Sequence, residues 1–297
     1  PYSSYVNRVY GFTAEDGASY VVKFYRPGRW SAEAIRQEHA FLSECNARDI
    51  PVVPPLAAED GQTLFVLEAE SETGIQEYHF AIFPKRGGRS FDAESDSDWI
   101  RLGALAGRLH SIGALARADA RPRLSSALAL NNLEVIEPLV HPEFRAKLSS
   151  LCRQAIARSA FLIDDLPILR IHGDLHRGNI LDRQGEGLLL LDFDDMVMGP
   201  AVQDLWLLLP GRTHECRREL SLLLEGYSEF SALPPGSLAA IETLRLFRIL
   251  HFLAWRSIQR EDDWFRRDFP DWGGRAFWLA EFEDIADQVA AIENGLD

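Results

Sequence analysis

Residues 171–181 read IHGDLHRGNIL, and after a short polar turn residues 188–195 read LLLLDFDD. The turn contains two glycines, so the end of the first segment and the start of the second are predicted to pair as a hairpin. A hairpin brings its two ends together, which would place Asn179 beside Asp192. An amide oxygen next to a carboxylate suits Mg²⁺, a hard cation that binds oxygen ligands. This stretch therefore predicts a magnesium site within a strand-and-loop segment.

Asp174 lies on the loop that leads into this hairpin. A carboxylate in that place can orient a substrate hydroxyl and accept its proton during phosphoryl transfer. Protein kinases arrange these roles as H-R-D-x-x-x-x-N followed by D-F-G. The same order and spacing predict Asp174 as the catalytic base. They predict Asn179 and Asp192 as magnesium ligands, with Asp192 also taking part in catalysis through the metal.

Two positions depart from the protein-kinase pattern. Gly173 stands where many kinases have an arginine that binds an activation-loop phosphate, and Asp194 replaces the glycine of D-F-G. We therefore expect neither regulation through such a phosphate nor the usual flipping of the D-F-G segment. At both positions the chain resembles the aminoglycoside phosphotransferase and choline kinase superfamily.

The first 84 residues are rich in predicted strands. Asp16-Gly17 favours a hairpin turn, and Ser31 is a good N-cap for a helix whose apolar residues follow at helical spacing. The predicted strands are residues 9–12, 20–25, 52–56, 63–67 and 79–83.

The rest of the chain is predicted to be mainly helical. Pro84 and the glycines after it break the strand pattern, and from Asp98 onward apolar residues recur at helical spacing. A strand-rich lobe at residues 1–84 and a mainly helical lobe at residues 85–297 would give the α+β plan of a two-lobed, protein-kinase-like fold. Further helices are predicted around residues 143–163, 216–230, 236–260 and 275–294, with the strand-and-loop segment at 168–194 between them.

The N-terminal lobe is predicted to bind ATP. Lys23, in a β-prone run, can contact the nucleotide phosphates if a glutamate from the following helix holds it. Glu38 is the predicted partner, and Glu33 is the alternative. No glycine-rich phosphate loop is found in the sequence, and residues 3–10 stand in its place.

Within that N-terminal segment, Ser4 and Asn7 are candidate phosphate contacts. The strand that ends at Phe83, before Pro84, is predicted to be the hinge between the lobes, whose backbone meets the adenine. All three residues are thus candidates for binding the nucleotide.

Other polar residues near the motif are expected to have structural roles. His172 and His176 flank Asp174 and are interpreted as bracing the loop, and His110 as a packed core histidine. Asp204, at a helix start after the motif, is expected to brace the backbone of the catalytic loop.

The composition limits the class of protein. The net charge of −14 argues against a nucleic-acid surface, which needs clustered lysine and arginine. No apolar run approaches the roughly 20 residues that span a membrane. The 3 cysteines lie far apart and form neither a disulfide framework nor a metal-binding pair. We expect a cytoplasmic monomer that binds neither nucleic acid nor membrane.

A closer resemblance is carried by residues 4–10, 22–27, 172–181 and 192–206. These segments resemble the bacterial stress response kinase A family. The resemblance implies a cytoplasmic serine/threonine protein kinase of the stress response, with a choline-kinase-like fold, ATP as donor and Mg²⁺ as cofactor. It also implies a protein substrate with a serine or threonine acceptor, and places Ser4 next to ATP.

Three other readings can be weighed against this one. A small-molecule kinase of the same fold would keep every site residue and accept an aminoglycoside, choline or a homoserine-like hydroxyl. The acidic run at residues 92–98 could attract such a cationic molecule. A pseudokinase should have lost Lys23 or one of the three motif residues, and all are present. A two-metal phosphohydrolase is rejected because Ile180 follows Asn179 where that class has histidine.

Overall fold

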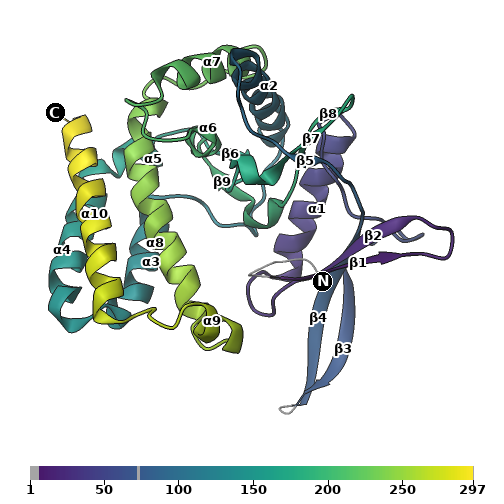
Figure 1. Ribbon diagram of the computed structural model, residues 1–297, viewed down its shortest axis with the longest axis horizontal. Helices are drawn as coiled ribbons and strands as arrows, with labels where there is room; N and C mark the ends of the chain where they lie inside the picture. Colours follow the sequence, from purple (N-terminus) through teal and green to yellow (C-terminus); the bar gives the residue numbers. More distant parts are fainter. Residues whose placement is uncertain (1–6, 72–73, 297) are drawn as a thin grey trace. The chain divides into compact units, whose positions relative to one another are not determined.

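The computed structural model describes residues 7–71 and 74–296 (Figure 1). The chain divides into two compact units. The first comprises Pro1–Pro122 with Leu169–Ala232, and the second comprises Arg123–Ile168 with Leu233–Asp297. The predicted lobe boundary after residue 84 is a different division of the chain and stays a prediction. All the candidate site residues fall in the first unit.

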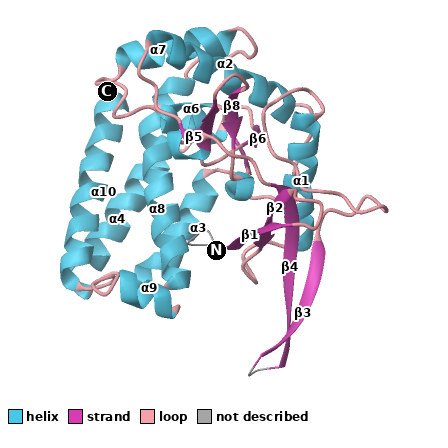
Figure 2. Ribbon diagram, turned by 45° about the vertical axis from the view of Figure 1, so that its right-hand side comes forward, coloured by secondary structure: helices cyan, strands magenta, loops and turns pink. Residues whose placement is uncertain are grey.

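An antiparallel sheet opens the first unit. Its strands are β1 (Arg8–Thr13), β2 (Ser19–Phe24), β3 (Phe65–Ser71) and β4 (Gly74–Pro84), in the order β1-β2-β4-β3. The predicted turn joins β1 to β2, with Gly17 at a φ of +83°, a conformation that favours glycine. Figure 2 shows β3 and β4 extending as one long hairpin.

One predicted strand is wrong. Residues 52–56 are irregular, although they lie against regular structure: Leu56 N donates to the carbonyl of Ile82 at 2.7 Å. Pro54 and Pro55 have no N–H group to give to a strand ladder. The β-prone valines could therefore not override the prolines beside them.

Helix α1 (Ala32–Asn46) packs against the sheet, and its start is the predicted one. The hydroxyl of Ser31 accepts a hydrogen bond from Ala34 N at 3.1 Å, which satisfies one of the free N–H groups of the first turn. Ile35 on this helix is buried in a cluster with Tyr25 and Ala81 from the strands. Tyr25 directly follows β2, and side chains two residues apart on a strand point to the same face. The helix therefore lies on the face of the sheet that carries Lys23.

The rest of the first unit contains the predicted catalytic segment, residues 168–194, and the elements that pack around it. The short strands are β5 (Arg89–Ser90), β6 (Leu169–Ile171), β7 (Ile180–Arg183), β8 (Gly187–Leu190) and β9 (Val197–Gly199). Single turns of 3-10 helix occur at Arg177–Asn179 and Phe193–Asp195. The helices are α2 (Asp96–Gly113), α6 (Val202–Leu208) and α7 (Arg217–Ser228).

Helices α2 and α7 touch through their backbones and lie side by side in Figure 1. A Cβ atom on Gly103 would lie 1.9 Å from the carbonyl oxygen of Leu223, and one on Gly226 would lie 1.9 Å from that of Ile100. Only glycine fits at either position. Helix α2, which carries His110, also packs against β6 at the start of the predicted catalytic segment.

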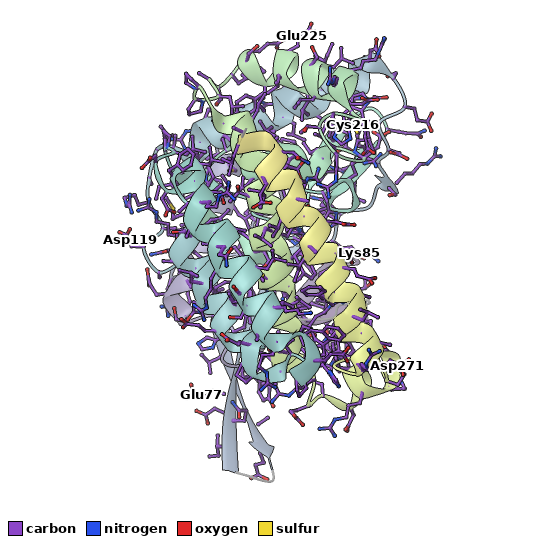
Figure 3. All side chains as sticks on the ribbon, turned by 90° about the vertical axis from the view of Figure 1, so that its left-hand side faces the viewer. Glu77, Lys85, Asp119, Cys216, Glu225 and Asp271 are labelled. Atoms are coloured by element: carbon purple, nitrogen blue, oxygen red, sulfur yellow. The ribbon has the colours of Figure 1, made fainter. Side chains whose placement is uncertain are left out.

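The second unit is helical. Its helices are α3 (Ser126–Ile136), α4 (Pro142–Ser159), α5 (Phe161–Asp164), α8 (Ile241–Gln259), α9 (Asp263–Asp268) and α10 (Arg275–Leu296), with 3-10 turns at Glu137–Leu139 and Ser237–Ala240. Helix α10 packs against α4 and α8, and Figure 3 shows α4 and α10 running alongside each other. Phe265, which is 2% exposed, packs against the rings of Phe269 and Trp272. Among the described residues, none of the helices is both long and apolar enough to cross a membrane.

Candidate active site

The catalytic loop is fixed at its start by Asp204. This aspartate, in the first turn of α6, accepts hydrogen bonds from His172 N at 2.8 Å and from Gly173 N at 2.9 Å. Its side chain is fully buried and also lies 3.0 Å from Nε2 of His110. The expected bracing role of Asp204 is confirmed. His110 is a core histidine, as predicted, and it holds Asp204 in place.

Gly173 has a local structural reason. Its φ is +82°, and a Cβ atom there would lie 2.1 Å from the carbonyl oxygen of Asp195. No side chain fits, so the arginine that many protein kinases place here is sterically excluded. The absence of that arginine follows from the backbone path of the loop.

The predicted hairpin forms and brings Asn179 and Asp192 to the same end. Strands β7 and β8 pair from Ile180 opposite Leu190 onward, and Leu191 N donates to the carbonyl of Asn179 at 2.9 Å. The side-chain amide nitrogen of Asn179 donates to the carbonyl of Asp174 at 2.9 Å. This hydrogen bond links the loop of Asp174 to the end of the hairpin that carries Asn179 and Asp192.

Asp192 differs from its neighbours in conformation and exposure. Its φ of +57° lies in the left-handed region, which is uncommon for residues other than glycine. Its side chain is 61% exposed, whereas that of Asp194, two residues later, is 5% exposed. Strained backbone of this kind is concentrated at functional sites. The carboxylate of Asp192 is thus accessible from solvent, whereas that of Asp194 is buried.

The donor set at the end of the hairpin fits Mg²⁺. Asn179 and Asp192 supply one amide and one carboxylate, in keeping with an ion that takes one or two protein ligands and completes its shell with water and substrate phosphates. Within residues 7–71 and 74–296 no group of three or more histidine, cysteine or acidic residues is arranged to hold a metal by itself. Magnesium binding by Asn179 and Asp192 stays a prediction.

Lys23 lies between the carboxylates of this site. Its Nζ is 3.7 Å from Oε1 of Glu38 and 3.7 Å from Oδ1 of Asp192. Glu33, the alternative partner, instead pairs with Arg36 on the surface. The structure therefore pairs Lys23 with Glu38, as the sequence analysis preferred.

Asp194 is the closest of these carboxylates to Lys23, at 2.9 Å. Burial by itself would raise the pKa of Asp194, but the charges of Lys23 and Arg29 outweigh it and hold that pKa below the usual value for aspartate. Nε of Arg29 lies 3.1 Å from the other oxygen of the same carboxylate. Asp194 is thus an ionised anchor for two cations, and Arg29 is a contributor that the sequence analysis missed.

The other nucleotide-binding predictions fall in different places. Asn7 is buried; its amide nitrogen donates to Asp194 at 3.1 Å and its oxygen accepts from Arg26 N. Phe83 lies next to the last residue of β4, opposite Val21 of β2. Ser4 lies outside the described residues. Contacts of all three predicted residues with a nucleotide stay predictions.

One buried arginine that the sequence analysis did not single out joins this site. Arg121, in the loop after α2, contacts Glu38 and the backbone of the segment that follows Asp192. No motif signals it, because its partners come from two distant parts of the sequence.

Asp174 lies on a loop whose start is braced by Asp204, and the hairpin that follows carries Asn179 and Asp192 at one end. Together with the buried Lys23–Glu38 pair, this arrangement is typical of a phosphotransferase of the two-lobed kinase type. The comparisons with known proteins agree. Residues 1–247 match the model of the phosphotransferase enzyme family, and the chain belongs to that family.

Curated relatives give a finer likeness. The chain is 36% identical to stress response kinase A of Escherichia coli strain K12 over 302 residues, covering 99% of this chain and 87% of that protein. It is 38% identical to the serine/threonine protein kinase RdoA of Salmonella typhimurium strain LT2, covering 98% of this chain and 87% of the relative. The predicted resemblance to stress response kinase A is confirmed.

Solved structures agree on the fold. The amicoumacin kinase hAmiN, in complex with AMP-PNP, Ca²⁺ and Ami, superposes with a TM-score of 0.71 at 19% identity, covering 99% of this chain and 87% of that one. The choline kinase LicA of Streptococcus pneumoniae gives a TM-score of 0.63 at 16% identity, covering 98% and 92%. The predicted fold, of the aminoglycoside phosphotransferase and choline kinase type, is confirmed.

Proposed function

We propose that this phosphotransferase is a serine/threonine protein kinase of the stress response, which uses ATP and Mg²⁺. The relatives that carry such names are 36% and 38% identical and span nearly the whole chain. The observation that carries the site is the position of Lys23, 3.7 Å from both Glu38 and Asp192. It joins the predicted phosphate-binding lysine, its partner and the predicted metal carboxylate in one cluster. We further propose that the enzyme is cytoplasmic and acts as a monomer.

In the proposed reaction the chain supplies position and one proton acceptor. Asp174 accepts the proton of the acceptor hydroxyl while that oxygen bonds to the γ-phosphorus of ATP and the bond to the bridging oxygen of ADP breaks. Lys23 holds the phosphates of the bound nucleotide. Asn179 and Asp192 would hold Mg²⁺, which when bound neutralises charge on the phosphate oxygens.

The neighbours of Asp174 favour this role. Its side chain is 19% exposed, so it remains open to a substrate. Nε2 of His176 lies 3.4 Å from the carboxylate, and the Asp174 carbonyl is fixed by the Asn179 amide. The loop is therefore held on both sides while the carboxylate stays accessible.

The acidic run at residues 92–98 gives little support to a cationic small molecule as the acceptor. The acidic run at residues 92–98 is engaged by the protein: Asp96 forms two hydrogen bonds with Arg218, at 3.1 and 2.5 Å, and Asp92 pairs with Arg177. The last aspartate of the run closes a capping box at the start of α2. Much of the acidic run therefore already has counter-charges or cap contacts.

Transfer of labelled phosphate from γ-labelled ATP with Mg²⁺ tests the proposal. Casein or a basic protein would be offered in parallel with aminoglycosides and amino alcohols. We expect label on serine or threonine of the protein, abolished by Asp174→Ala and retained by Asp119→Asn, a matched change at a surface aspartate labelled in Figure 3. Label found on a small molecule alone would contradict the protein-kinase assignment.

A further inference from the structure

Arg121 is a fully buried arginine that joins helix α1 to the segment after Asp192. Its Nη2 donates to Oε2 of Glu38 at 2.6 Å, and its Nε donates to the carbonyl of Ala34 at 2.8 Å. On its other side, Nη1 donates to the carbonyl of Asp194 at 2.7 Å. One guanidinium therefore contacts both the helix that carries the partner of Lys23 and the loop that carries the predicted metal carboxylate.

The loop that bears Arg121 is held by the same two elements. Ala120 N donates to the side-chain oxygen of Gln37 on α1 at 3.0 Å, and the carbonyl of Pro122 accepts from Met198 N on β9 at 2.9 Å. The guanidinium also lies 4.5 Å from the ring centre of Trp30. The backbone of this loop and the side chain of Arg121 thus connect α1 to β9 and to the segment before it.

Only a guanidinium can make these contacts together. It is planar, always charged, and carries five N–H donors that point in several directions, whereas a lysine ammonium is a compact charge at the end of a flexible stem. Burying such a charge is costly unless it is paired and hydrogen-bonded. Glu38 supplies the opposite charge for this buried guanidinium, so the positions of the two side chains depend on each other.

Glu38 divides its two oxygens between two cations. Oε2 is bound by Arg121 at 2.6 Å, and Oε1 faces Lys23 at 3.7 Å. Burial raises the pKa of Glu38, while the charges of Lys23 and Arg121 oppose that rise. Without Arg121 the buried carboxylate of Glu38 would attract Lys23 more strongly, and Lys23 would be less available to a nucleotide phosphate.

The charge balance of the cluster leads to the same expectation. Within residues 7–71 and 74–296, four carboxylates face three cations in this cluster, so the loss of one cation makes the site less favourable for the negative phosphates of ATP. The carboxylates are Glu38, Asp192, Asp194 and Asp195, and the cations are Lys23, Arg29 and Arg121.

We propose that Arg121 is a positioning residue of the phosphotransfer site: it sets Glu38, and through it Lys23, at a fixed place relative to the Asp192 loop. This inference rests on the proposed function. It predicts that Arg121 governs the affinity for Mg·ATP and the Mg²⁺ dependence, without touching the reacting atoms.

The test compares Arg121→Lys and Arg121→Gln with Arg170→Lys in the full chain. Arg170 is a matched control because it is equally buried and binds Glu44 on α1 through two hydrogen bonds, at 2.7 and 3.1 Å, yet Glu44 is not a candidate site residue. Unfolding midpoints are measured first, and kinetics are then compared at a temperature where all three variants are folded.

Both Arg121 variants should raise the KM for ATP and the Mg²⁺ concentration for half-maximal activity by about tenfold or more, the effect of losing one charge-assisted hydrogen bond in a buried site. Arg170→Lys should change either quantity by less than about threefold at equal stability. Equal shifts in KM for Arg121→Lys and Arg170→Lys would overturn the inference. So would failure of both Arg121 variants to fold where Arg170→Lys folds.

A binding measurement separates this inference from the proposed function. Mg·ADP should raise the unfolding midpoint of the wild type and of Arg170→Lys, and should do so much less in the Arg121 variants. If the wild type binds Mg·ADP in this pattern but transfers no phosphate to protein, the proposed acceptor is wrong and the role of Arg121 stands. If the wild type does not bind Mg·ADP, both proposals fall.

Discussion

The amino group of Lys23 lies 2.9 Å from Oδ1 of Asp194, closer than to Glu38 or to Asp192. Burial lowers the pKa of Lys23, but the charges of Asp194 and Glu38 outweigh it and raise that pKa well above the ordinary value. Lys23 is therefore protonated in the folded protein. Asp194, which replaces the glycine of D-F-G, is thus the nearest of the three carboxylates that would compete with the proposed nucleotide phosphate for Lys23.

Asp194→Asn should destabilise the fold by about 3–5 kcal/mol, because Lys23 and Arg29 would keep buried charges without their common carboxylate. Urea unfolding measures the loss. Asp195→Asn is the control, since its side chain is 36% exposed and pairs with Arg29 nearer to solvent. A loss for Asp194→Asn no larger than for the control would show that Asp194 is not the anchor described.

Asp192→Asn should weaken nucleotide binding only when Mg²⁺ is present. The substitution removes the exposed carboxylate and leaves the hairpin intact, so ADP alone should bind as before. Titration calorimetry with and without Mg²⁺ measures the difference. Asp182→Asn, on β7 of the same hairpin, is the control and should keep the wild-type Mg²⁺ effect. An unchanged affinity for Mg·ADP in Asp192→Asn would contradict its assignment as a metal ligand.

The residues that a local pattern can specify were found from the sequence. The hairpin that joins Asn179 to Asp192 depends on a turn and two apolar runs next to each other in the chain. Glu38 follows Ser31, its helix cap, by two turns, and spacing along one helix is readable. In each case the interaction partners are separated by a short and regular stretch.

Arg121 and Arg29 could not be found in this way. Arg121 binds Glu38 from 83 positions away, and Arg29 likewise contacts Asp194 from a distant part of the sequence. Neither has a spacing that marks it, since arginines outside motifs are normally surface residues. A buried ion pair between distant segments becomes visible only when tertiary packing has brought the segments together.

Stability should depend on pH through His39. Burial, with added repulsion from Lys23 and Arg121, lowers the pKa of His39 from 6.5 to about 3. Between these values the unfolded chain binds a proton that the folded chain does not, so the free energy of unfolding falls as pH falls, by up to roughly 1.4 kcal/mol per pH unit.

His39→Gln checks this dependence. His39 contacts the Tyr25 hydroxyl at 2.8 Å and the Thr63 hydroxyl at 2.8 Å, and a glutamine amide can also donate and accept. Urea midpoints between about pH 4.5 and pH 7 should vary less in the variant than in the wild type, by the equivalent of one proton. Parallel pH profiles would rule out His39 as the source.

Gly226→Ala should destabilise the first unit by about 1–3 kcal/mol or more, because its Cβ atom would lie 1.9 Å from the carbonyl oxygen of Ile100 and would force α2 and α7 apart. Gly87→Ala is the control: it has no neighbour within 4 Å of the added atom. Thermal unfolding of the two variants gives the comparison. Equal unfolding midpoints for Gly226→Ala and Gly87→Ala would show that α2 and α7 accommodate the added methyl group without loss of stability.

Where the sequence misled, two local tendencies competed. Residues 52–56 contain two valines that favour a strand, but three prolines in the stretch 51–55 remove the backbone donors that a strand needs. The composition of the two compact units depends on tertiary contacts instead. Contacts join residues 1–122 to residues 169–232, and no local pattern indicates which distant segments will associate.

Asp174 is proposed to be the proton acceptor of an ATP-dependent phosphotransferase. Single-turnover transfer of the γ-phosphate, measured for the wild type and Asp174→Asn at saturating Mg·ATP, tests it most directly, with the affinity for Mg·ADP measured alongside. If Asp174 is the proton acceptor, the transfer rate should be about 10²–10⁴-fold lower in Asp174→Asn, with nearly unchanged Mg·ADP affinity and stability. A transfer rate close to that of the wild type in the folded variant would contradict it.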